Sequence, residues 1–310
     1  MTQPAPFQSL SQLLLKSVAL FALMMAIVGP PQAGAQARTN CVGGVVLKLS
    51  AGIAAQGSLI TTEVLPPKGV SNLSSEWDGR STPVWREGEA STAWHGLLGV
   101  DLEKPPGRYE WKVAWTTAEG KSQSCSAFVT VHAGKFATER LTVEKQFVQP
   151  DPEQEKRAEA DQVKMRAIYD TITPERLWEG KFRMPLKNVT TGGNFGKRRI
   201  LNGQARSPHS GVDFPAPAGT PVFASQSGKV VVAENLYYSG NTVVIDHGFG
   251  IYTMYAHLSE IAVHAGEPVK AGADIGKVGA TGRVTGPHLH WGLTVDHARV
   301  NAMQIAQRQL

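Results

Sequence analysis

The sequence has little cysteine and no long apolar run. Only two cysteines occur in 310 residues, Cys41 and Cys125, and neither belongs to a C-x-x-C motif. This spacing excludes a structural zinc site built from cysteine thiolates. The most apolar segment, residues 17–28, is shorter than the roughly 20 residues that cross a bilayer, and no later segment is long enough. We therefore expect no stable insertion in a membrane, and a permanent anchor is the weaker alternative.

Charge is also modest, because charged residues make up 18% of the chain and the formal net charge is +5. The 42% of hydrophobic residues is enough for about two ordinary domains, so the chain is globular and not disordered. A small positive charge suits an anionic partner such as cell-wall polymer, but nucleic acid or a lipid surface would suit it equally. Charge alone does not choose among these partners.

The N-terminal residues have the pattern of a secretory signal. Lys16 precedes the apolar run, and the small residues at 33–35 and 35–37 offer cleavage sites. We therefore expect residues 1–37 to be a signal peptide and the protein to be exported, to the periplasm in the first place or into the medium as the alternative. Cys41 is not preceded by the small apolar residues of a lipidation site.

The two cysteines have the phase of core-facing residues in two strands. Cys41 alternates in step with Val45 and Leu47, and Cys125 with Ala127 and Val129. Both sulfurs could therefore face one core and form a disulfide. Two buried free thiols are the alternative.

Residues 38–133 consist of short alternating segments broken by Gly, Pro and Ser, which is typical of a small antiparallel sandwich. The clearest segment is 108–115, where aromatic and apolar residues occupy one face and Glu110 and Lys112 the other. We expect an N-terminal antiparallel β-sandwich domain here.

Residues 134–179 are predicted to be a linker that contains a helix. Asp151 is a candidate N-cap, Pro152 suits the first helical position, and Gln154 completes a capping box. The stretch up to Tyr169 is rich in charge and has only a sparse apolar stripe, which indicates a connecting helix and not a core helix.

Residues 180–310 again alternate between strand and turn patterns, with glycine-rich loops between the strands. The expected strands are 221–224, 228–235, 241–247, 251–257 and 288–295. The chain is therefore predicted to be mainly β, with a second antiparallel β domain at residues 180–310.

Two histidines on one predicted strand have the pattern of site residues. In 288–295, Leu289, Trp291 and Leu293 share one face, so His288 and His290 lie on the other. Residues two apart on a strand are about 6.6 Å from each other. One imidazole could then bind a metal ion while its neighbour reaches the water on that ion.

A second candidate pair is His209 and Asp213. Four residues of straight strand would separate them by about 13 Å, so the chain must bend, and Ser210-Gly211 offers a place for the bend. A surface histidine followed by an unrelated aspartate is the alternative. This motif alone does not decide between the two.

The order of three motifs resembles that of the M23, lysostaphin-like zinc metallopeptidases. The motifs are H-S-G-V-D at 209–213, Y-A-H-L-S at 255–259 and G-P-H-L-H-W-G at 286–292. The similarity covers roughly residues 182–295 and includes N-F-G-K-R-R at 194–199. The upstream domain resembles, more weakly, the immunoglobulin-like (Ig-like) domain that precedes some of these peptidase domains.

The resemblance implies a set of site residues, an activity and a substrate. His209, Asp213 and His290 would bind one Zn²⁺ per catalytic domain, and His257 and His288 would lie beside the activated water. The implied enzyme is a zinc metalloendopeptidase that cuts peptide cross-links of peptidoglycan, at bonds between D-alanine and diaminopimelate or, as the alternative, between glycines. One of the two histidines would accept the proton and the other would bond the oxyanion, and the sequence does not say which.

Other classes of function stay open at this point. Inactive relatives that activate cell-wall amidases have lost ligand or catalytic positions, whereas all five are present here. In a third hypothesis the sandwich binds the wall, or it covers the groove and restrains activity. Lys197, Arg198, Arg199 and Arg206 could contact stem-peptide carboxylates or glycan, or form a solvated loop. Peptidoglycan is the expected partner, a recruiting or regulatory protein stays open, and no nucleic-acid partner is expected.

Overall fold

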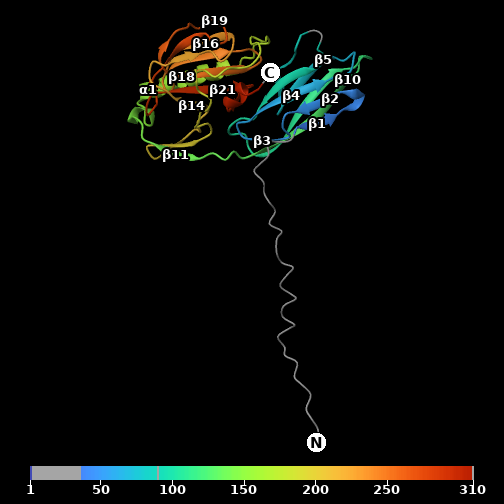
Figure 1. Cartoon of the computed structure of the whole chain (residues 1–310), viewed down its shortest axis with the longest axis horizontal. Coiled ribbons are helices and arrows are strands. Elements are labelled where there is room, and N and C mark those ends of the chain that lie inside the picture. Colours follow the sequence, from blue (N-terminus) through green and yellow to red (C-terminus); the bar gives the residue numbers. More distant parts are fainter. Residues whose placement is uncertain (2–35, 89–90, 309–310) are drawn as a thin grey trace. The chain divides into compact units, whose positions relative to one another are not determined.

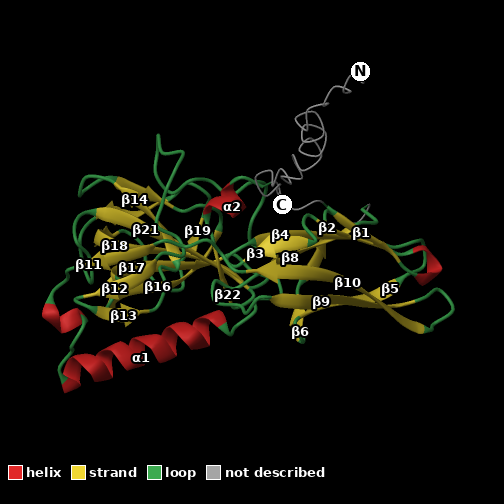
Figure 2. Ribbon diagram, turned by 90° about the horizontal axis from the view of Figure 1, so that it is seen from below, coloured by secondary structure: helices red, strands yellow, loops and turns green. Residues whose placement is uncertain are grey.

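Strands dominate the part of the chain that the computed structural model describes, which is residue 1 and residues 36–88 and 91–308 (Figures 1 and 2). Strand makes up 46% and helix 10%, so the mainly-β prediction is confirmed. The expected signal peptide lies almost entirely outside the described residues. Within them, no helix is long and apolar enough to cross a membrane.

Residues 37–132 form two five-stranded sheets, in the orders β1-β2-β4-β8-β7 and β3-β10-β9-β5-β6. The first contains β1 (Ala37–Asn40), β2 (Val46–Leu49), β4 (Leu59–Leu65), β7 (Val84–Arg86) and β8 (Trp94–Gly99). The second contains β3 (Ile53–Ala55), β5 (Ser71–Trp77), β6 (Arg80–Thr82), β9 (Gly107–Thr116) and β10 (Ser122–His132). Neighbouring strands are antiparallel except β3 and β10, which are parallel. The Ig-like character of this region stays a prediction.

The two sheets share one apolar core, as the alternation predicts. Trp111 and Val113 of β9 are fully buried, while Glu110 and Lys112 are exposed. The indole nitrogen of Trp111 donates to the hydroxyl of Ser75 at 2.8 Å, so its polar atom is satisfied inside the core.

The disulfide prediction is confirmed. Cys41 follows β1 and Cys125 belongs to β10, and they pack against the sandwich core and form a disulfide across 84 positions of sequence. The alternative of two free thiols is therefore wrong.

Helix α1 (Pro152–Tyr169) begins at the predicted cap. The Asp151 carboxylate accepts a hydrogen bond from the Gln154 main-chain nitrogen, and the Gln154 side chain accepts one from the Asp151 main chain. Only Ala158 is buried within the helix, which lies along β16 (Figure 2). Lys164 pairs with Glu234 of that strand at 2.9 Å. The prediction of a charge-rich connecting helix is confirmed.

A small sheet joins the segment before α1 to the C-terminal half. It contains β11 (Thr138–Leu141), β12 (Arg198–Leu201) and β13 (Gln204–Arg206). β11 runs parallel to β12, with Glu139 opposite Arg199. The sequence did not predict β11, because its pairing depends on hydrogen bonds to residues 198–201, which are distant in the sequence. A part of the expected linker is therefore also a sheet strand.

A nine-stranded sheet builds the rest of the C-terminal half. Its members are β14 (Gly211–Pro215), β15 (Pro221–Phe223), β16 (Gly228–Leu236), β17 (Gly240–Asp246), β18 (Ile251–Ile261), β19 (Pro268–Val269), β20 (Asp274–Val278), β21 (His288–Val295) and β22 (Ala298–Val300). Two short 3₁₀ helices (Val42–Gly44 and Lys145–Phe147) and helix α2 (Met303–Ala306) complete the described elements.

The five predicted strands of this half are present with small changes at their ends. The largest change is in β18, which continues past His257 to Ile261. His257 has a left-handed backbone (φ 64°) and the register shifts nearby, so the strand passes through an irregularity there. The short strands β14, β19, β20 and β22 were not predicted.

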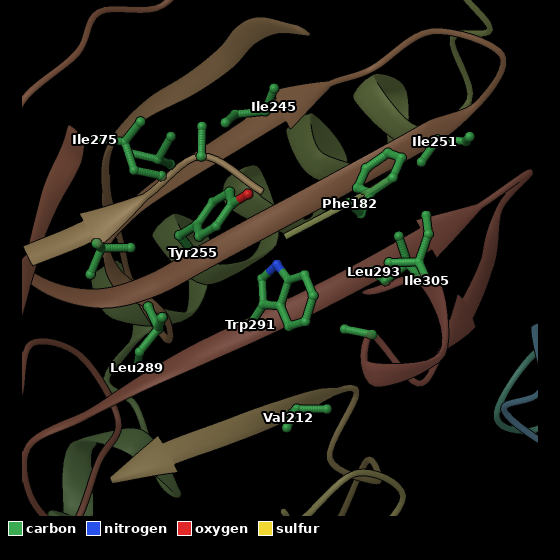
Figure 3. Close-up of a cluster of buried hydrophobic side chains, with 14 of the residues drawn as sticks. Phe182, Val212, Ile245, Ile251, Tyr255, Ile275, Leu289, Trp291, Leu293 and Ile305 are labelled. Carbon is green, nitrogen blue, oxygen red and sulfur yellow. The ribbon is translucent and has the colours of Figure 1, made fainter. Parts of the chain in front are cut away.

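The apolar row of β21 anchors the core of this sheet. Leu289 and Trp291 are fully buried, and Figure 3 shows them in one cluster with Tyr255 of β18 and Ile245 of β17. Because side chains alternate along a strand, His288 and His290 lie on the opposite face. The core therefore fixes the direction in which these two histidines point.

His247 follows β17 and is fully buried. Its Nδ1 lies 2.8 Å from the Ser227 carbonyl oxygen and its Nε2 lies 2.7 Å from the Thr253 hydroxyl. These contacts indicate a structural role for His247. Burial lowers the pKa of His247 from 6.5 to about 4, so the imidazole is neutral in the folded protein.

This neutral histidine predicts a loss of stability in mild acid. Below pH 6.5, His247 is protonated in the unfolded chain but stays neutral in the folded chain. The free energy of unfolding therefore falls as the pH drops from about 6.5 towards about 4. Between pH 7 and pH 5 the wild type should lose about 2 kcal/mol more unfolding free energy than His247→Gln, measured by urea titration. His264→Gln, which changes an exposed histidine, should keep the wild-type dependence. Equal pH dependence in wild type and His247→Gln would contradict this account.

Candidate metal centre

Strand pairing places Asp213 beside His290. β14 and β21 are antiparallel neighbours with these two residues directly opposite, so their side chains share the face turned away from the Trp291 core. The Asp213 Oδ1 atom lies 3.1 Å from His290 Nδ1. Both residues are less than a tenth exposed.

His209 reaches the same place from outside the strand. β14 begins only at Gly211. The main chain of His209 is held by two hydrogen bonds, to the Lys197 carbonyl oxygen and from the Gly196 nitrogen. Its Nε2 lies 3.0 Å from Asp213 Oδ1 and 2.8 Å from His290 Nδ1. The structure thus brings together the two residues that a straight strand would keep apart.

These three atoms form a triangle that suits a metal ion. Ligand atoms about 2.0–2.1 Å from a tetrahedral zinc ion lie about 3.3 Å from one another. The three distances here are 2.8, 3.0 and 3.1 Å. One proton can bridge only one pair of these atoms, whereas a cation attracts all three. Two imidazoles and one carboxylate are also a donor set of the kind that catalytic zinc uses, so the residues fit a zinc ion.

The ionisation of Asp213 and His209 suits metal ligands. Burial opposes the charge on Asp213, yet hydrogen bonds with His209 and His290 hold the pKa of its carboxyl well below the ordinary value. Burial lowers the pKa of His209 to about 4. At neutral pH the site therefore holds a carboxylate and a neutral His209, which has a lone pair to offer.

Two further side chains fix the carboxylate of Asp213. The Asn194 amide donates to its Oδ2 at 3.1 Å, and the Arg199 guanidinium lies 3.7 Å from the same oxygen. These contacts orient the carboxylate so that its other oxygen, Oδ1, faces His209 and His290. Sequence reasoning placed both residues in the stretch 194–199 that resembles the family, but it gave neither of them this role.

His257 and His288 lie next to the triangle. Their ring centres are 4.9 Å apart, and that of His257 is 5.9 Å from that of His290. Nδ1 of His257 lies 2.9 Å from the Thr281 carbonyl oxygen, and Nδ1 of His288 lies 2.8 Å from that of Gly286. A carbonyl oxygen can only accept, so each Nδ1 carries the proton and each Nε2 is free to accept one. Burial, followed by the influence of His290 and His288, lowers the pKa of His257 to about 3.

A pocket of about 240 Å³ opens beside these residues. Asp213, His257 and His288 form part of its lining. Glu139 and Leu141 of β11, with Val143 after it, form one wall. The loop between β20 and β21 forms another. Within the described residues, no side chain of the sandwich lines this pocket. This lining does not support the hypothesis that the sandwich covers the site. The wall is contributed instead by residues 139–143, which belong to the stretch expected to be a linker.

Residues 207–302 match the sequence model of a protein family described as "Peptidase family M23". The match includes all three residues of the triangle and both neighbouring histidines. Residues 207–302 form a peptidase family M23 domain.

The chain is similar to two curated proteins of Vibrio cholerae. It is 51% identical over 112 residues to peptidoglycan DD-endopeptidase ShyA, a match that covers 36% of this chain and 26% of that protein. It is 42% identical over 118 residues to peptidoglycan DD-endopeptidase ShyB, covering 38% of this chain and 28% of that protein. The chain thus spans about a quarter of the length of these curated relatives.

The likeness to one solved structure extends beyond the M23 domain. A crystal structure from Pseudomonas aeruginosa that is described as a peptidase M23 superposes with a TM-score of 0.61 at 28% identity. The superposition covers 81% of this chain and 95% of that chain. The shared architecture therefore includes residues upstream of the M23 domain.

Gly211 leaves room for the His290 ring. A Cβ at this position would lie 2.5 Å from the His290 ring and 2.9 Å from the Trp291 carbonyl oxygen. On the opposite strand, a Cβ at Gly292 would come no nearer than 3.3 Å to the Met254 side chain. Gly211 and Gly292 face each other across β14 and β21, so they provide a matched pair.

We predict that Gly211→Ala weakens metal binding by the M23 domain about 10–100-fold, the range typical of changes that disturb the orientation of a ligand. Gly292→Ala should change the affinity much less, because its new methyl group would lie 3.3 Å from Met254 and in ordinary contact, at 3.9 Å, with the His290 ring. Competition with a zinc-binding dye would measure both affinities. Equal affinities in the two variants would show that the space beside His290 does not control the site.

Proposed function

We propose that this chain is a zinc-dependent endopeptidase that hydrolyses peptide cross-links of bacterial peptidoglycan. The observation that carries the proposal is the convergence of His209, Asp213 and His290 within 3.1 Å, with two further histidines beside them. The names of the two relatives from Vibrio cholerae support peptidoglycan as the substrate.

We further propose that the bond cleaved joins D-alanine to diaminopimelate. Both relatives are named DD-endopeptidases, which supports a bond between centres of D configuration over one between glycines. The glycyl-glycine bond is then an outcome that product analysis would reveal.

The residues of the site have two roles in hydrolysis, which are metal binding and proton transfer. Zinc held by His209, Asp213 and His290 would supply Lewis acidity towards a water molecule and towards the scissile carbonyl. The free Nε2 of His257 or of His288 accepts the proton that the attacking water loses. An imidazole that has gained this proton becomes a donor, either to the oxyanion or to the leaving amine.

We also propose that the protein acts outside the cytoplasm, in the periplasm. The disulfide between Cys41 and Cys125 supports this, because disulfides form and persist in oxidising compartments. The signal-like pattern at residues 1–37 supports it as well.

Digestion of purified peptidoglycan tests the proposal. Mass spectrometry should show fragments cut at the D-alanyl–diaminopimelate cross-link. His290→Ala should lose both zinc and activity, because it removes a ligand. His257→Ala or His288→Ala should keep zinc and lower turnover about 10²–10⁴-fold, the usual contribution of general acid–base catalysis.

His264→Ala is the matched control, since this exposed histidine lies outside the site, and it should leave both zinc content and turnover unchanged. Wild-type protein that carries zinc and yields no fragments would contradict the hydrolase proposal. Zinc content that is near zero in the wild type and unaffected by His290→Ala would favour a non-hydrolytic regulator.

A further inference from the structure

One cation on the wall of the pocket has no anionic partner in the structure. Arg283 follows the Thr281-Gly282 turn between β20 and β21 and lines the pocket beside His257 and His288. Its guanidinium lies 4.5 Å from the centre of the Tyr238 ring. Among residues 36–88 and 91–308 it makes no ion pair and no side-chain hydrogen bond.

Three other basic groups near this pocket have partners within the chain. Lys197 pairs with Glu139 at 3.0 Å, and Arg206 donates to the Val148 carbonyl oxygen at 2.6 Å. Arg199 faces the carboxylate of Asp213. Of the residues that the sequence offered as contacts to substrate carboxylates, these three therefore have partners within the chain.

The acids of the pocket are committed as well. Asp213 contacts His209 and His290, and Glu139 forms an ion pair with Lys197. Arg283 is also half-buried, and this burial, followed by the charge of Arg199, lowers the pKa of its guanidinium. A partly desolvated guanidinium without a carboxylate is suited to take one from a ligand.

The loop that carries Arg283 is fixed to the catalytic residues. The Thr281 carbonyl oxygen accepts from His257 Nδ1, and the Thr281 hydroxyl donates to the Leu258 carbonyl oxygen at 2.8 Å. Gly282 has a left-handed backbone (φ 75°) in close contact with Gly240, so a side chain there would collide with it. An anion held by Arg283 would therefore have a defined position relative to His257.

We propose that Arg283 binds a free carboxylate of the peptide substrate and so selects cross-links that carry one near the scissile bond. This inference rests on the proposed function, because it takes the ligand to be a peptidoglycan peptide. Cross-linked stem peptides offer two sources of this chemistry, the side-chain carboxylate of diaminopimelate and the carboxylate of a terminal alanine. The planar guanidinium can donate two parallel hydrogen bonds to either.

Binding of synthetic cross-linked peptide dimers tests the proposal. Three dimers are compared: one with both carboxylates free, one amidated at diaminopimelate and one amidated at the terminal alanine. The full-length, zinc-loaded chain carries His288→Ala to slow turnover, and fluorescence anisotropy gives each Kd. Amidation at one of the two positions should weaken binding about tenfold, the size expected for loss of a hydrogen bond to a charged group, and identifies the carboxylate.

Adding Arg283→Ala should abolish this preference, so that free and amidated dimers bind alike, while Arg283→Lys should keep part of it. Arg86→Ala is the matched control, since that arginine also stacks on an aromatic ring, Trp94, but lies in the sandwich; it should retain the full preference. The proposal is overturned if no amidation weakens binding, if no dimer binds, or if Arg283→Ala keeps the preference. Cleavage of the same dimers by the wild type is scored separately, so failure of the hydrolase proposal is distinguishable.

Discussion

The site depends on one carboxylate held between two imidazoles. Asp213 Oδ1 lies 3.0 Å from His209 Nε2 and 3.1 Å from His290 Nδ1, and the two nitrogens are 2.8 Å apart. Three electron-rich atoms this close together need a positive charge among them, which a metal ion provides better than a single proton. The surrounding structure acts to keep these atoms in place, from the Trp291 core behind β21 to the amide of Asn194 on the second carboxylate oxygen.

Segments far apart in the sequence meet around this carboxylate. The loop at 193–197 bonds to the main chain of both His209 and Asp213, and β11 pairs with β12 to add a wall to the pocket. The loop before β21 holds His257 through Thr281 and also carries Arg283. Groups suited to metal binding, proton transfer and recognition of a substrate anion therefore lie on connected segments, and these include β11 from the stretch that was expected to be a linker.

The sequence predicted those features that short-range patterns determine. Alternation at 288–295 placed His288 and His290 opposite a fully apolar row, the cap at Asp151 located helix α1, and strand phase paired Cys41 with Cys125. It could not predict β11, or how His209 reaches Asp213, because both depend on hydrogen bonds between segments distant in sequence. Arg283 gave no signal either, since only the structure shows which arginines are already paired.

The central claim is that His209, Asp213 and His290 hold one metal ion together, and anomalous diffraction from zinc-loaded crystals tests it most directly. Data collected on both sides of the zinc absorption edge should give one strong peak, about 2.0–2.2 Å from His209 Nε2, Asp213 Oδ1 and His290 Nδ1. A peak elsewhere in the molecule, with these three side chains turned away from one another, would contradict the account.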